Sequence, residues 1–171
     1  MTLVELMVAT GVGSIVLAAV LALSLFSARS FAALGNYVDL DIKSRNALDT
    51  MSTDIRQAGS LSDYQPNRLI FQTTDRTGNP ATLTYLYDSA MTTLTRTLGV
   101  RSTVLLTNCT YLNFGIFARN PIGGQWNAYS NGIVSNCKLV QLTWVCQRSL
   151  LGGRIANTES VQSAKVVMRK P

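Results

Sequence analysis

At 171 residues the chain is about the length of one ordinary domain with an appendage, which excludes two large independent cores. It has no histidine and its three cysteines form no CxxC pair, so we expect neither a metal site nor a cofactor. The formal charge of +6 is uneven, because residues 1–59 carry four basic and five acidic side chains whereas residues 60–171 carry eleven and four. The basic character therefore belongs to the C-terminal part.

The first segment, residues 1–28, is strongly apolar. No charged side chain interrupts it from Leu6 to Ala28, and a helix of about 23 residues spans roughly the 30 Å hydrocarbon core of a bilayer. A removed secretory signal has a shorter apolar region followed by a cleavage site, whereas this run continues into further helix. Residues 1–28 are therefore predicted to be a retained helix that lies in a membrane or in a filament core.

Residues 29–59 are predicted to continue this helix in amphipathic form. Large apolar residues recur at three- to four-residue steps while charged residues face elsewhere, and Gly59 followed by Ser60 marks a helix stop. The whole helix would be almost 90 Å long, so its first half must project from any domain of this size. The stripe expected to be buried comprises Phe31, Leu34, Val38, Ile42, Leu48, Met51 and Ile55, and the residues expected to face away from it are Asp39, Asp41, Lys43, Arg45, Asp49 and Asp54.

Two glycines weaken the apolar segment. Gly11 and Gly13 each destabilise a helix by up to about 1 kcal/mol relative to alanine. They either let the segment unwind locally once it leaves lipid or permit close approach of a neighbouring helix, as small residues do in membranes. Both interpretations stay open at this point.

One acid, Glu5, lies immediately before the uncharged run. A carboxylate is costly to bury unless it is paired, and the amine of Met1, on the same subunit or a neighbour, is the natural partner. In a low-dielectric bundle such a pair would fix the register between subunits. The alternative is an acid stabilised only by the helix dipole and by headgroup water.

The opening residues Thr2 to Ala9, TLVELMVA, strongly resemble the mature N-terminus of the type IV pilin superfamily, which comprises type IV pilins and type II secretion pseudopilins. The resemblance implies a leader removed by a prepilin peptidase, N-methylation of Met1 and a docking role for Glu5. The acid at position 5 is expected of the processed form. Met1 replaces the usual phenylalanine, and Ala22 stands where many type IV pilins have a helix-kinking proline.

The same resemblance implies the function and the partners. We expect a non-enzymatic structural subunit that polymerises with copies of itself, and with minor pilins, into a bacterial filament. An assembly ATPase and a platform protein would drive this assembly. The chain would be stored in the inner membrane and then reside in an extracellular pilus. The alternative within the family is a pseudopilin of a short periplasmic filament in type II secretion.

Residues 60–171 are predicted to form a β-rich globular head. The periodicity shifts towards two and turn residues separate the segments, which indicates antiparallel hairpins. The sheet should close over the amphipathic stripe, giving an α+β fold with one long helix packed on a sheet. The expected strands are Arg68–Thr74, Thr82–Tyr87, Thr92–Thr97, Thr103–Thr107, Cys109–Ala118, Leu139–Cys146 and Ala164–Arg169.

Three segments of the head resemble the larger minor pilins and the J-type pseudopilins, over residues from about 50 to 171. They are Tyr85 to Asp88 paired with Leu94 to Arg96, the aromatic run Phe114 to Phe117, and the final Val166 to Arg169.

The cysteines suggest one disulfide and one free thiol if the head lies outside the cytoplasm. Direct antiparallel pairing of 109–118 with 138–147 would bring Cys109 opposite Cys146, within disulfide reach. The apolar alternation of the two strands places these residues on opposite faces unless a bulge intervenes. Pairing of Cys109 with Cys137 therefore remains the alternative.

A signal-anchored enzyme or binding domain is the rival from another class. The sequence has no GxSxG motif, and Asp63, Asp75, Asp88 and Glu159 are far apart along the chain, so we identify no catalytic residue. Nucleic acid is a conceivable partner of a basic head. However, the arginines are scattered singly, which is typical of a solvated face: Arg68, Arg76, Arg96, Arg101, Arg119, Arg148 and Arg154.

Overall fold

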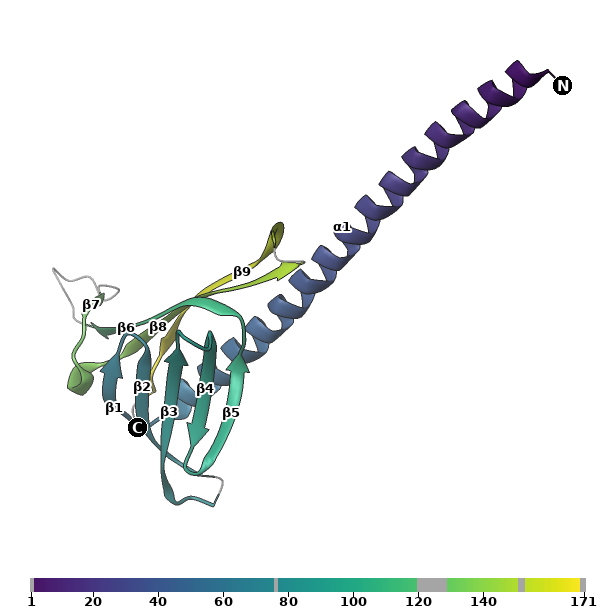
Figure 1. Cartoon of the computed structure of the whole chain (residues 1–171). Helices are drawn as coiled ribbons and strands as arrows, with labels where there is room; N and C mark the ends of the chain where they lie inside the picture. Colours follow the sequence, from purple (N-terminus) through teal and green to yellow (C-terminus); the bar gives the residue numbers. More distant parts are fainter. Residues whose placement is uncertain (1, 76, 120–128, 151–152, 170–171) are drawn as a thin grey trace.

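The computed structural model describes residues 2–75, 77–119, 129–150 and 153–169, and it shows one long helix that carries a β-rich head at its C-terminal end (Figure 1). Helix α1 runs from Leu3 to Gln57, which corresponds to about 80 Å at 1.5 Å per residue. It ends two residues before the predicted stop, because Ala58 adopts an extended conformation and Gly59 donates its N–H to the Gln72 carbonyl at 2.9 Å. The α+β prediction is confirmed.

The head contains two antiparallel sheets instead of the single sheet predicted. The first has the order β1-β2-β3-β4-β5 and the second the order β7-β6-β8-β9. The first comprises β1 (Ser60–Gln65), β2 (Arg68–Thr74), β3 (Pro80–Asp88), β4 (Thr93–Leu98) and β5 (Arg101–Leu106). The second comprises β6 (Cys109–Arg119), β7 (Tyr129–Asn131), β8 (Leu139–Leu150) and β9 (Gly153–Val167), with a short 3-10 turn, Val134–Asn136, before β8.

The seven predicted strands all exist, and the structure adds β1 and β7 to them. The predicted pairing of β3 with β4 is confirmed, because Tyr85 lies opposite Arg96 and Tyr87 opposite Leu94. The final strand is much longer than predicted, since β9 begins at Gly153. Together β8 and β9 form a hairpin that extends along the helix towards its N-terminal half (Figure 1).

The side of α1 that packs on the head differs from the predicted stripe. The buried helix residues are Leu40, Ser44, Ala47, Met51 and Ile55. Of the predicted stripe, Met51 and Ile55 are buried and Leu48 is partly buried, whereas the four residues before them are exposed. The prediction was wrong for that half because it followed one run of large apolar side chains, whereas the side that faces the head there carries Leu40 together with the small residues Ser44 and Ala47. Ser44 and Ala47 allow the helix to approach Trp144 closely, and the Trp144 indole Nε1 lies 3.4 Å from the Ser44 hydroxyl.

The core lies between the helix and both sheets. Met51 and Ile55 of the helix share one buried cluster with Phe71 of the first sheet and with Phe114 and Trp144 of the second. All five side chains are essentially inaccessible to solvent. Burying such side chains contributes about 1.5–3 kcal/mol each, so this cluster fixes the head on the last third of α1.

Candidate assembly surface

The N-terminal half of α1 is an apolar surface that the head leaves uncovered. Every described residue from Thr2 to Phe26 is exposed, although most of them are apolar. By length and composition this helix could cross a membrane. Monomeric soluble proteins rarely expose contiguous apolar patches of more than a few hundred Å², so this surface requires lipid or another protein around it.

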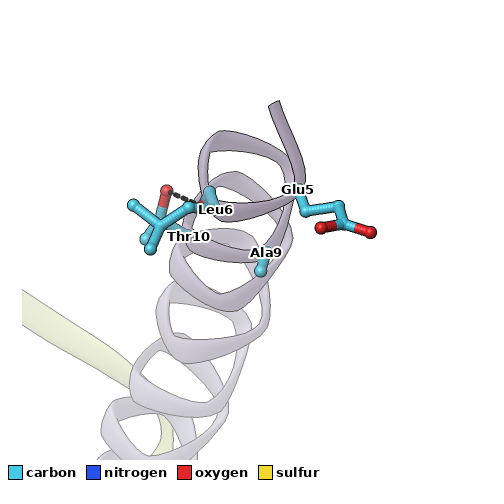
Figure 2. A pocket seen from close by; sticks show the side chains of 4 residues that line it. All are labelled: Glu5, Leu6, Ala9 and Thr10. Carbon is cyan, nitrogen blue, oxygen red and sulfur yellow. Dashed lines mark hydrogen bonds between the residues drawn. The ribbon is translucent and has the colours of Figure 1, made fainter. Parts of the chain in front are cut away.

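Glu5 caps the start of this helix. Its side-chain oxygen accepts the Thr2 backbone N–H at 2.7 Å, and its own N–H donates to the Thr2 hydroxyl at 3.3 Å, so the two residues form a reciprocal capping box. Figure 2 shows the Glu5 side chain extending away from the helix, beside a shallow hollow lined by Glu5, Leu6, Ala9 and Thr10. This arrangement uses one carboxylate oxygen and leaves the carboxylate accessible to a cation. Met1, the predicted partner, lies outside the described residues.

The two glycines of the apolar segment lie in regular helix. The helix is continuous through Gly11 and Gly13, and a Cβ atom built at either position would meet no atom within 4 Å. The absence of a Cβ leaves room at these positions for close approach of another helix. Local unwinding at Gly11 or Gly13 remains a prediction.

A second apolar stripe lies on the side of α1 that faces away from the head. Phe31, Leu34, Val38 and Ile42 are between 45% and 74% exposed. On a helix with 3.6 residues per turn, the centre of this stripe lies roughly 140° from that of the buried residues. The stripe ends where Arg45 and Asp49, both exposed, continue the same side of the helix. We call Phe31, Leu34, Val38 and Ile42 the outer stripe.

Polar contacts tie the middle of the helix to the second sheet. Arg148 of β8 forms an ion pair with Asp39 at 2.8 Å, and Gln162 of β9 reaches Asp41 at 3.4 Å. The hydrogen bond from Lys43, together with Arg148, lowers the pKa of Asp39. Asp39 and Asp41 were predicted to face away from the packed side, and instead they flank it. These contacts fix the rotation of the helix, and therefore the direction in which the outer stripe points.

The last turns of the helix are tied to the first sheet by Asp54. Its carboxylate accepts hydrogen bonds from Arg96 Nε at 2.6 Å and Arg96 Nη2 at 3.1 Å, and a further one from the Tyr85 hydroxyl. The Asp54 and Arg96 side chains are only 15% and 19% exposed. Asp54 was predicted to face away and Arg96 to be solvated, and both predictions were wrong. Only the topology, which places β3 and β4 under the helix end, brings these residues together.

The cysteine pair lies where the two sheets meet. Cys109 is the register partner of Cys146 in the β6–β8 ladder, as predicted, and a bulge between Cys109 and Tyr111 lets both side chains point inward. Cys109, Cys137 and Cys146 are all buried, and none of the three is in a disulfide in the structure. The apolar alternation of the sequence had placed Cys109 and Cys146 on opposite faces of the sheet, and the bulge brings them to the same face.

Three of the four acidic residues considered for catalysis, Asp63, Asp75 and Asp88, have separate structural roles, and Glu159 is exposed on β9. Asp63 pairs with Arg68 on the β1–β2 hairpin at 2.6 Å. Asp75 accepts the N–H groups of Thr77 and Asn79 within the β2–β3 turn, and Asp88 accepts those of Ala90 and Met91 in the next turn. Within the described residues, no group of three or more histidine, cysteine, aspartate or glutamate side chains gathers as metal ligands would.

Of the seven arginines considered for nucleic-acid binding, four have described side chains, and three of these four are paired with acids. Arg68, Arg96 and Arg148 form ion pairs with Asp63, Asp54 and Asp39. Arg101 is exposed on the edge strand β5. Arg76 and the side chains of Arg119 and Arg154 lie outside the described part of the chain.

No family model, no curated protein sequence and no solved structure gives a significant match to this chain.

Proposed function

We propose that this chain is a structural subunit of a type IV pilus-like bacterial filament, in which copies of α1 pack together and the heads form the outer surface. The N-terminal resemblance from Thr2 to Ala9 suggests the family. The architecture supports the proposal, because a long exposed apolar helix carries a rigidly attached head.

The observation that carries the proposal is the length of the uncovered apolar surface. It runs from Leu3 to Ile42, which is about 60 Å along the helix. A bilayer covers only about 30 Å of this length. A solitary membrane anchor would therefore leave the outer stripe in water, whereas a bundle of identical helices would cover both parts at once. The position of the stripe, opposite the head, suits a contact with other subunits.

Within this filament we propose that Glu5 pairs with the amine of Met1, on the same subunit or its neighbour, and so fixes axial register. The capping box leaves the carboxylate accessible for that contact. Processing by a prepilin peptidase, N-methylation of Met1, and assembly by an ATPase and a platform protein belong to the same proposal. Mass spectrometry of the first peptide of filament protein tests where the mature chain begins and whether its amine is methylated.

A second candidate is a pseudopilin of a short periplasmic filament in type II secretion. The continuous helix through Ala22, where many type IV pilins have a proline, favours this candidate. The two candidates share the helix bundle and differ in where the filament ends. Electron microscopy of sheared cell-surface material distinguishes them, because only a pilus subunit occurs in long fibres.

A charge placed in the outer stripe tests the proposed contact. Val38→Glu puts a carboxylate where we propose that subunits meet, and Asn46→Glu puts the same charge on an exposed position of α1 outside the stripe. Both variants should insert into the membrane with a folded, protease-resistant head. We expect Val38→Glu to be lost from sheared filaments and Asn46→Glu to be incorporated normally. Normal incorporation of both would refute the proposed surface.

A further inference from the structure

Cys109 lies at the junction of the two sheets. Its N–H donates to the carbonyl of Thr92, in the turn between β3 and β4, at 2.9 Å, and its own carbonyl accepts the hydroxyl of Tyr87 in β3 at 2.9 Å. The β3–β4 hairpin of the first sheet therefore holds its backbone. Cys109 is the first residue of β6 and its register partner, Cys146, lies in β8, so both cysteines belong to the second sheet. A covalent link between the two side chains would therefore tie β6 to β8 within the second sheet, at the point where this sheet contacts the β3–β4 hairpin of the first.

The backbone hydrogen bonds show which kind of pair the two cysteines form. The Cys109 N–H is directed to Thr92, and the bond across the β6–β8 ladder runs from Gln147 N–H to the Asn108 carbonyl at 2.9 Å. This pattern identifies Cys109 and Cys146 as a non-hydrogen-bonded antiparallel pair, in which Cα atoms are about 4.5 Å apart and side chains are closest. That separation lies within the range that a disulfide spans.

The bulge at Thr110 gives the two side chains a common direction. It adds one residue to β6, so that Cys109 shares the inner face with Leu112, Phe114 and Ile116 although the strict alternation would turn it outward. Cys109 and Cys146 are 0% and 1% exposed. The neighbouring Cys146 thiol and then burial raise the pKa of the Cys109 thiol. The hydrogen bond with Cys109 lowers the pKa of the Cys146 thiol. The two thiols therefore face each other in contact, inside a buried junction.

Cys137 is too distant to replace Cys146. Phe117 lies opposite Leu139, at the end of β6 remote from Cys109, and Cys137 precedes Leu139 by two residues. At about 3.3 Å per residue, Cys109 and Cys137 are separated by more than 20 Å along the strand. A disulfide requires Cα atoms within about 7 Å. The alternative pairing of Cys109 with Cys137 is thus incompatible with this register.

We propose that Cys109 and Cys146 form a structural disulfide that links β6 to β8 within the second sheet, beside its contact with the first sheet, and that Cys137 remains a thiol; this inference rests on the proposed function only in placing the head outside the cytoplasm. The two thiols lose two protons and two electrons as the S–S bond forms. The electrons pass by thiol–disulfide exchange to the disulfide of a protein thiol oxidoreductase, which is reduced to a dithiol. Because both cysteines are inaccessible in the folded head, the exchange occurs before β6, β8 and the helix close over them.

Trypsin provides a direct test, because its sites place each cysteine in a different peptide: 102–119 holds Cys109, 120–138 holds Cys137 and 139–148 holds Cys146. The full chain is directed to a bacterial periplasm by a known secretory leader, denatured in alkylating reagent, digested and analysed by mass spectrometry. We expect peptides 102–119 and 139–148 to be joined until a reductant is added, and 120–138 to be alkylated throughout. Three alkylated thiols, or any joined pair that contains 120–138, would overturn the inference.

Thermal unfolding gives a second readout, measured on the exported full chain after solubilisation in detergent. The bond closes a loop from 109 to 146, so the double variant Cys109→Ala/Cys146→Ala should melt roughly 10 °C or more below the wild type. Reductant should lower the wild-type Tm and leave the Tm of the double variant unchanged. Cys137→Ala is the matched control, and it should keep the reductant-sensitive Tm. A wild-type Tm that is indifferent to reductant after complete reduction would contradict the proposed role. Neither readout requires filaments, so failure here is distinct from failure of the assembly proposal.

Discussion

Asp54, in the last turn of the helix, receives two hydrogen bonds from Arg96 of β4, at 2.6 and 3.1 Å. The pair is largely buried, and the Tyr85 hydroxyl of β3 donates to the same carboxylate. These contacts lock the C-terminal end of the projecting helix to the first sheet. A head that could swivel on this end would not hold the outer stripe in a defined direction.

Replacing Asp54 with alanine should strongly destabilise the head. The substitution leaves the Arg96 guanidinium and the Tyr85 hydroxyl without their shared acceptor in a mostly buried site, which should lower the free energy of unfolding by about 3 kcal/mol. Urea denaturation of the detergent-solubilised full chain measures the change.

Asp63→Ala is the matched control, because it breaks the Arg68–Asp63 pair, whose side chains are 36% and 41% exposed. An exposed pair contributes about 1 kcal/mol or less. If both substitutions lowered the free energy of unfolding equally, burial would not make the Asp54 site more important for stability than an exposed ion pair.

Tyr85 should make the stability of the head fall at high pH. Burial, and then the Asp54 carboxylate, raise the pKa of Tyr85 above its ordinary value of 10.0. Below pH 10 the phenol is protonated in both the folded and the unfolded state, so its full contribution to the free energy of unfolding is present. Above pH 10 the unfolded chain loses the proton first, so stability should fall by up to about 1.4 kcal/mol per pH unit. Urea titrations at pH 9 and 11 should show this extra slope in the wild type and not in Tyr85→Phe.

Ser44 should tolerate alanine and reject leucine. It is fully buried between the helix and the second sheet, with the Trp144 indole and the Ser160 hydroxyl both 3.4 Å from its oxygen. Leucine would force the helix away from Trp144, which should lower the free energy of unfolding by about 1–3 kcal/mol. Trp144 fluorescence during denaturation reports the change. If leucine were as well tolerated as alanine, the helix would not be closely packed here.

Glu5 offers a test that separates its charge from its capping role. Glutamine at this position keeps the capping box with Thr2 and removes the charge, whereas alanine removes both. If the charge fixes the register, both Glu5→Gln and Glu5→Ala should insert into the membrane and fail to enter filaments. Wild-type incorporation of Glu5→Gln would show that Glu5 acts only as a helix cap.

Local signals were sufficient to predict much of this fold. The uncharged run and the absence of proline predicted the helix, and β2 has the predicted bounds because its alternation and turn residues agree. The Cys109–Cys146 register followed from matching the lengths of two apolar strands.

The side of the helix that packs on the head could not be predicted by the same reasoning. Apolar periodicity shows which residues avoid water. It does not show whether the chain's own head or another molecule covers them. Phe31 and Val38 form as regular a stripe as Met51 and Ile55, yet only the latter contact the head. The Asp54–Arg96 contact joins residues 42 positions apart and depends on the sheet order, which no local pattern contains.

Cross-linking between subunits tests the central claim most directly. A photoreactive residue at position 38, in the outer stripe, is compared with the same residue at position 46, on an exposed part of the helix outside it. After irradiation of intact sheared filaments, we expect position 38 to yield covalent dimers of this chain and position 46 to yield few. Filaments in which position 38 forms no dimers, or a chain found only as a lipid-linked monomer, would contradict the account.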